Sequence, residues 1–196
     1  VWLDSNKYKH PHSSYDSILA VDAFTGIQTD YIDGFKKLNE YQSITNDWIF
    51  GYLSYDLKND TEPLSSQNFD GLDFPDLYFF QPKKLFFIKG NNVEVKYLNR
   101  FASEIETDLS QIKNQPITNN QQPTTSSIKI KLRIHKDEYY QKMNSILNNI
   151  HRGDIYEASF CQEFYSENSI IHPVEIYQHL NKISKPPFAT FLKLTF

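Results

Sequence analysis

The sequence has little of several residue types, and each shortage excludes a class of protein. A single cysteine, Cys161, among 196 residues excludes internal disulfide bonds and is typical of a reducing compartment, so we expect the cytoplasm. Only 6 glycines occur, without a GxGxxG or GxxxxGK[ST] pattern, which argues against dinucleotide-binding and P-loop proteins. The longest apolar runs have the length of strands and predict no membrane span. Because 24 acidic residues outnumber 20 basic ones, nucleic acid is not an expected partner.

What the sequence does contain is enough apolar material for a core. Hydrophobic residues make up 39% of the chain, which predicts a folded protein of one domain or one and a half. The clearest boundary is residues 114–127, a stretch with two prolines and no charge that indicates an exposed linker. We therefore expect an N-terminal domain over 1–113 and the beginning of a second domain over 128–196.

The first of these units is dominated by strand signals. Strands are expected at 48–55, 77–80, 85–88 and 93–95, with 90–92 as the turn of a hairpin. Apolar periodicity predicts helices over 31–41 and 101–113. The expected fold class is α+β, with antiparallel sheets and outer helices.

The second unit reads as helix, strand, helix, strand. Tyr139, Met143, Ile146 and Ile150 share one helical face, and Gly153 fits the left-handed position that ends a helix. The aromatic run 155–165 predicts a strand, Pro173 begins a second helix, and 188–194 begins another strand. A last apolar strand would leave an open sheet edge, so we expect a chain truncated at its C-terminus that exposes apolar surface and self-associates.

Isolated polar residues in these segments are given structural interpretations. Asp154 is expected to form a turn, and Glu157 and Glu163 are expected to face solvent. Cys161 is expected to be a small buried hydrophobe rather than a nucleophile. His10 and His12 have a weak metal-ligand spacing without a third ligand nearby.

Motifs in order along nearly the whole chain resemble a known family. They are Trp2-Leu3-Asp4-Ser5, His10-Pro11-His12-Ser13-Ser14-Tyr15-Asp16, Gly51-Tyr52-Leu53-Ser54-Tyr55-Asp56 with Glu62, the I-x-x-GD-I-Y run at 150–156 and KPPFATFL at 185–192. This order is similar to that of the anthranilate synthase component I family of chorismate-binding enzymes. The HPxSxYD spacing after LDS resembles its aminodeoxychorismate synthase component I branch more closely than its anthranilate branch.

The resemblance implies a fold and a reaction. The fold would be the N-terminal part of a layered enzyme of antiparallel sheets with helices outside. The reaction would be amination of chorismate to 4-amino-4-deoxychorismate in 4-aminobenzoate and folate biosynthesis, with Mg²⁺ and with ammonia from a glutamine amidotransferase subunit. The family's catalytic glutamate, lysine and magnesium carboxylates follow the last predicted strand, so we expect no catalytic residue and no activity in this chain.

Other interpretations remain open. The chain could derive from an anthranilate synthase component I, or it could be a non-catalytic module for tryptophan binding or subunit docking. An isochorismate or salicylate synthase is a further alternative, although those enzymes typically lack such an N-terminal unit.

The resemblance also implies one site within the chain, a pocket for L-tryptophan. Carried over by position, its residues are Ser5, His12, Ser13, Ser14, Tyr15, Pro187, Phe188 and Ala189. Asp4, Ser5 and carbonyls near Pro187 would accept from the ammonium group, while Tyr15 and Phe188 would flank the indole. Ser14 stands where the family usually has a basic residue. The alternative is that these residues only pack two units together.

Overall fold

The structure is a computed structural model that describes residues 1–8, 14–65, 68–115 and 128–194. Its chain divides into two compact units, which are described separately. One is Val1–Pro116 with Val174–Phe196, and the other is Ile117–Pro173. The expected linker over 114–127 lies outside the described residues from position 116 onward.

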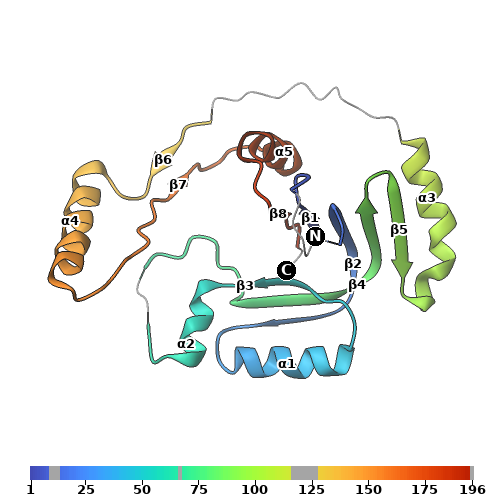
Figure 1. The fold of residues 1–196 in the computed structure, drawn as a ribbon, viewed down its shortest axis with the longest axis horizontal. Coiled ribbons are helices and arrows are strands. Elements are labelled where there is room, and N and C mark those ends of the chain that lie inside the picture. The colour runs from blue at the N-terminus through green and yellow to red at the C-terminus, as the bar shows by residue number, and fades with distance from the viewer. Residues whose placement is uncertain (9–13, 66–67, 116–127, 195–196) are drawn as a thin grey trace. The chain divides into compact units, whose positions relative to one another are not determined.

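The larger unit is built on an antiparallel sheet of six strands (Figure 1). The strands are β1 (Trp2–Asp4), β2 (Ser17–Thr29), β3 (Phe50–Leu53), β4 (Leu77–Lys89), β5 (Asn92–Tyr97) and β8 (Ala189–Phe191). Their order is β3-β4-β2-β1-β8, and β5 pairs with β4. The predicted α+β class with antiparallel pairing is therefore confirmed, and so is the hairpin, in which Lys89 lies opposite Asn92.

One strand prediction is wrong: residues 77–80 and 85–88 belong to the single central strand β4 rather than to two strands. Pro82 lies between them and has no N–H to donate to a neighbouring strand. On one side of β4, β3 pairs only as far as Phe80 and pairing with β5 begins only at Lys84, so neither strand needs that donor. On the other side, β2 shifts register between Ala23 and Thr25, opposite the proline. β4 therefore continues across Pro82 as one strand, because no neighbouring strand depends on an N–H at that position.

Helices and 3₁₀ turns connect these strands. They are α1 (Gly34–Thr45), η1 (Tyr55–Leu57), α2 (Lys58–Thr61), η2 (Asn99–Glu104), α3 (Ile105–Asn114) and α5 (Pro173–Ser184). The helix predicted over 31–41 begins three residues late, because the Asp30 carboxylate accepts from the Ile32 N–H and holds a turn. The helix predicted over 101–113 is α-helical only from Ile105, since its first turn is the 3₁₀ helix η2.

The buried core lies on this sheet. Its members are apolar residues of β2, β3 and β4, namely Ala20, Phe50, Phe80, Leu85 and Phe87. Phe87 is 1% exposed, and Trp48 contacts it edge-on with ring centroids 5.4 Å apart. Leu3, Tyr15 and Ile18 pack against the same cluster. The segment around β1 is thereby fixed to the centre of the unit.

One lysine is buried among the described residues, and two carboxylates nearer the surface pair with it. Lys84 is 8% exposed, and its Nζ lies 2.6 Å from Asp108 Oδ2 and 2.7 Å from Glu104 Oε2. The Tyr97 hydroxyl donates to the same Asp108 oxygen at 2.8 Å. Hydrogen bonds from Lys84 and Tyr97 lower the pKa of Asp108, and those from Lys84 to Asp108 and Glu104 raise the pKa of Lys84. The cluster fastens α3 to β4.

The smaller unit contains α4 (Lys136–Arg152) and a short ladder of β6 (Lys131–Leu132) with β7 (Phe164–Tyr165). Gly153 ends α4 with a φ of 83°, as predicted. The Asp154 N–H donates to the Asn149 carbonyl at 3.0 Å, so the predicted turn is confirmed. Glu163 is paired with Arg133 at the surface at 2.8 Å.

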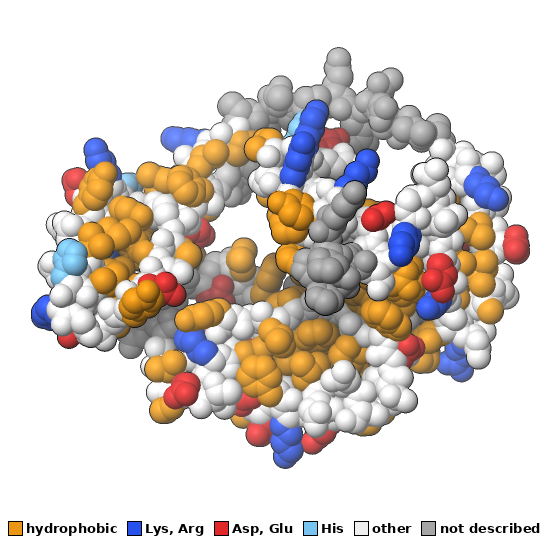
Figure 2. Space-filling view, viewed as in Figure 1, with side chains coloured by type: hydrophobic (Ala, Val, Ile, Leu, Met, Phe, Trp, Pro, Cys, Tyr) orange, Lys and Arg blue, Asp and Glu red, His pale blue; other side chains and the backbone are white. Residues whose placement is uncertain are grey.

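Two predictions for this unit are wrong. The strand expected over 155–165 is paired only at its last two residues, because β6 offers only two residues as a partner. Cys161 is exposed rather than buried, whereas the ring of its neighbour Phe160 packs against Tyr139 of α4. Figure 2 shows apolar side chains gathered on the surface of this unit, and Tyr156 is 91% exposed. None of its described residues is fully buried.

Candidate amino-acid site

The candidate site lies where three segments meet in the larger unit. β1 pairs on one side with β2, Leu3 opposite Ile18, and on the other with β8, Leu3 opposite Thr190. This pairing brings the chain after β1, the beginning of β2 and the approach to β8 to one end of the three strands. A cavity of about 530 Å³ opens there. That volume is in the usual range for small-molecule pockets.

Five of the eight residues predicted by resemblance line this cavity. They are Ser5, Tyr15, Pro187, Phe188 and Ala189, and Asp4 lines it as well. Ser14 is described and exposed, and it is not among the lining residues. His12 and Ser13 lie outside the described residues. The structure thus joins residues that are more than 170 positions apart in the sequence.

Backbone hydrogen bonds fix the polar side of the cavity. The Ser5 N–H donates to the Asp16 carbonyl at 2.9 Å, and the Tyr8 N–H donates to the Ser5 carbonyl at 2.9 Å. Asp16 is held to the β4–β5 hairpin, because its N–H donates to Ile88 and its carboxylate accepts from the Gly90 N–H at 2.7 Å. The aspartate of the HPxSxYD motif therefore holds the residue before β2 against the hairpin.

Apolar side chains form the remaining walls. The Tyr15 ring lies 4.7 Å from the ring of core residue Phe87, so its position is set by the core. Leu3 and Ile18 pack against the same core and also line the cavity. Phe188, in contrast, is 80% exposed. An aromatic ligand between Tyr15 and Phe188 would remove much of this exposed apolar area from water.

The charged groups at the cavity are acidic. Asp4 and Asp16 line it, and no lysine or arginine among the described residues does so. Asp4 Oδ1 accepts from the Asn6 N–H at 2.8 Å. The Ser5 hydroxyl oxygen is buried and has no hydrogen-bond partner among the described residues. The site therefore offers carboxylates to a cation and one unsatisfied hydroxyl, which costs free energy while it remains unpaired.

Sequence reasoning missed further lining residues, namely Leu3, Tyr8, Asp16, Ser17, Ile18 and Thr190. Ser17 and Ile18 could have been found from strand pairing, because they lie opposite Asp4 and Leu3 in the register of β1 and β2. Tyr8 carried no such signal. It reaches the cavity because Asn6 and Lys7 both adopt positive φ and turn the chain back.

Magnesium ligands are not found in the described part of the chain. There, no group of three or more His, Cys, Asp or Glu side chains is placed to hold a metal ion. No step of a reaction is therefore assigned to a metal at these residues. In the same described segments, no helix combines the length and apolarity needed to cross a membrane.

Comparisons with known proteins agree on one family. The model of the chorismate binding enzyme family matches residues 1–195. An anthranilate synthase component I-like protein of Synechocystis sp. is 25% identical over 158 residues, covering 80% of this chain and 32% of that protein. Anthranilate synthase component 1 of Buchnera aphidicola is 26% identical over 169 residues, covering 81% of this chain and 32% of the relative.

A solved structure has the same fold. The crystal structure of anthranilate synthase component I from Streptococcus pneumoniae superposes with a TM-score of 0.73 at 16% identity, covering 91% of this chain and 49% of that one. The chain thus spans about a third of the length of the curated relatives and about half of the solved structure. With the family model matched over almost its entire length, the chain belongs to the chorismate-binding enzyme family.

Proposed function

We propose that the cavity beside β1 and β8 binds an aromatic amino acid, L-tryptophan, within the N-terminal portion of a chorismate-aminating enzyme. One observation carries the proposal. Residues 3–8 and 15–18 meet residues 187–190 at a cavity that has an acidic side, an aromatic side and a buried hydroxyl without a partner among the described residues. A ligand that accepts from the Ser5 hydroxyl would supply the partner that this buried group lacks.

The chemistry of the lining assigns a place to each part of the ligand. The ammonium group would lie near Asp4, whose second carboxylate oxygen remains available, and near carbonyls of the Pro187 segment. The indole would lie between Tyr15 and Phe188. Because the described lining contains no cationic side chain, the ligand's carboxylate would depend on hydroxyl donors such as Ser5.

Calorimetric titration of this chain tests the site. L-tryptophan should bind, and tryptamine, which keeps the ammonium group but lacks the carboxylate that would accept from Ser5, should still bind. Indole-3-propionate, which lacks the ammonium group, should bind at least tenfold more weakly. No heat with L-tryptophan or tryptamine at millimolar concentration would refute the proposal.

A serine variant separates binding from packing. Ser5→Ala should leave stability unchanged or slightly raised, because the hydroxyl has no partner to lose. The same change should weaken L-tryptophan binding about tenfold, the worth of one hydrogen bond to a charged group. Ser43→Ala on the exposed face of α1 is the matched control and should change neither quantity measurably.

For the whole protein we propose amination of chorismate at C4 to give 4-amino-4-deoxychorismate, with a glutamine amidotransferase as ammonia source and Mg²⁺ as cofactor. The HPxSxYD spacing supports this branch. Formation of anthranilate is the second candidate, supported by the names of the curated relatives, one an anthranilate synthase component 1 and the other an anthranilate synthase component I-like protein. Incubation of the full-length protein with chorismate, ammonia and Mg²⁺ separates the two by product, and no consumption of chorismate would refute both.

A further inference from the structure

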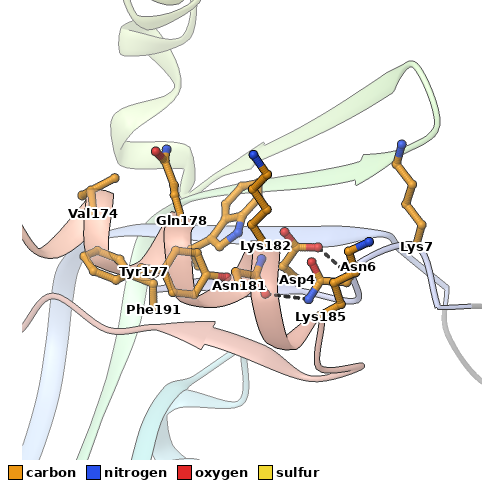
Figure 3. A pocket seen from close by; sticks show the side chains of 11 residues that line it. Asp4, Asn6, Lys7, Val174, Tyr177, Gln178, Asn181, Lys182, Lys185 and Phe191 are labelled. Carbon is orange, nitrogen blue, oxygen red and sulfur yellow. Dashed lines mark hydrogen bonds between the residues drawn. The ribbon is translucent and has the colours of Figure 1, made fainter. Parts of the chain in front are cut away.

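A second cavity, of about 700 Å³, lies between α5 and the strands β1 and β8 of the larger unit (Figure 3). The cross-strand pair Trp2 and Phe191 forms part of its wall. Tyr177 of α5 adds a third ring, whose centroid is 5.4 Å from that of Phe191. The cavity therefore has aromatic walls contributed by three different elements.

The charge at this cavity is opposite in sign to that of the chain. Lys7, Lys182 and Lys185 line it, against the single carboxylate of Asp4, whereas the whole chain has a net charge of -4. None of the three lysines forms an ion pair with any residue that the structure describes. Figure 3 shows Lys7 and Lys182 extending toward the same side of the cavity. Such a cluster attracts anions.

The backbone at two of these lysines, Lys7 and Lys185, is held in an unfavourable conformation. Asn6, Lys7 and Lys185 have φ values of 51°, 61° and 43°, a region that residues with a Cβ rarely adopt. Asn6 Nδ2 donates to Asn181 Oδ1 and to the Pro186 carbonyl, both at 2.7 Å, which ties the turn after β1 to the end of α5. Strain that is held in place by several contacts is common where a ligand is clamped.

A buried donor faces the same space. The Tyr177 hydroxyl oxygen is buried and makes no hydrogen bond of standard geometry with the described residues. Burial and the Asp4 carboxylate raise the pKa of this hydroxyl, an effect that the Trp2 indole partly offsets. It therefore stays protonated at neutral pH and can donate to an anionic oxygen.

We infer that this cavity is a second ligand site, which binds a small aromatic carboxylate. The ring would pack among Trp2, Tyr177 and Phe191, and the carboxylate would lie near Lys182 and Lys185 and accept from the Tyr177 hydroxyl. The site differs in charge from the acidic cavity proposed for L-tryptophan. The two cavities select opposite ends of a ligand, an anionic group in one and a cationic group in the other.

Nuclear magnetic resonance can test this directly, because the chain has only two tryptophans, Trp2 and Trp48, and hence two indole N–H signals. Benzoate should shift the Trp2 signal saturably and leave the Trp48 signal in place. Benzamide has the same shape without the charge and should bind at least tenfold more weakly. Trp2→Phe, which keeps an aromatic wall, identifies the signal. Equal binding of benzamide, or no saturable shift with benzoate, would overturn the inference.

Variants separate the site from general attraction by surface lysines. Lys182→Gln combined with Lys185→Gln should weaken benzoate binding about tenfold, and Tyr177→Phe should weaken it severalfold without loss of stability. Lys89→Gln, at the exposed end of β4, is the matched control and should have no effect. Ser5→Ala should also leave benzoate binding unchanged, because Ser5 does not line this cavity. The L-tryptophan site and the benzoate site can therefore be refuted independently of each other. If Lys89→Gln weakens binding as much as the double variant, the anion is held only by the general field and the site is refuted.

Discussion

Gly51 of the GYLSYD motif is expected to be irreplaceable for a steric reason. A Cβ added at Gly51 would meet the Tyr78 carbonyl oxygen at 1.9 Å and Phe79 Cα at 2.7 Å, where ordinary contacts begin at 3.4 Å. Both obstacles belong to the backbone of β4, so no rotation of a side chain can relieve them. We predict that Gly51→Ala forces β3 away from β4.

The expected loss of stability follows from the core residue that β3 holds in place. Phe50 is 7% exposed and belongs to the core cluster, and its full burial contributes about 1.5–3 kcal/mol. Loss of backbone pairing along β3 adds to this value. The expected decrease in the free energy of unfolding is therefore about 3 kcal/mol or more, at the upper end of costs for overpacked sites.

Urea denaturation followed by tryptophan fluorescence measures this change, because Trp48 lies next to β3 and contacts Phe50 and Phe87. Gly26→Ala is the matched control. Its added Cβ would lie 3.2 Å from the Phe79 carbonyl oxygen, which a shift of a few tenths of an ångström relieves. The control should stay within about 1 kcal/mol of the wild type. If Gly51→Ala also stays within that margin, the steric reasoning is refuted.

Three further predictions concern charge, backbone and surface. Since burial and Asp108 raise the pKa of Tyr97 to about 12 from 10.0, stability should fall as pH rises from 10 to about 12, and Tyr97→Phe should remove part of that fall in denaturation midpoints. If the midpoints of Tyr97→Phe fell with pH as much as those of the wild type, the prediction would be wrong. Gly90→Ala should lower the free energy of unfolding in denaturant by about 1 kcal/mol, because φ is 56° at Gly90. The added Cβ would meet nothing within 4 Å, so the cost would come from the backbone conformation alone. An unchanged free energy of unfolding would argue against this turn conformation. Because apolar side chains are exposed, the chain should self-associate as its concentration rises in analytical ultracentrifugation. The double variant Leu180→Gln and Ile183→Gln removes side chains that are 60% and 81% exposed, so it should associate less. A wild-type chain that stays monomeric at every concentration would contradict this prediction.

Elements with a strong local signal were predictable from the sequence. The apolar face of α4 and Gly153 set the type and end of that helix, and the turn at Gly90 set the β4–β5 hairpin. Both depend on contacts between residues close in the chain. The Asp30 turn that delays α1 also uses a local contact, but its effect on the start of the helix was not apparent from periodicity alone.

Elements that depend on distant partners were predicted less well. β2 was not predicted, since Asp22 and Gly26 interrupt its apolar pattern, and the structure accommodates Asp22 at a φ of 56° beside a shift in register. The aromatic run 155–165 has the composition of a strand but lacks a partner along most of its length. Composition alone does not supply the neighbouring strand that a β-strand needs.

The sequence by itself indicated the fold class through composition and local periodicity. Its motif order gave the family resemblance, and that resemblance pointed to five residues that line the cavity proposed for L-tryptophan. Only the tertiary structure decided that β8 pairs with β1, and that this pairing forms one cavity with an acidic lining and another with three lysines. The physical reason is register. Hydrogen bonds between strands nearly 190 residues apart fix which side chains meet, and no local pattern in the chain specifies that register.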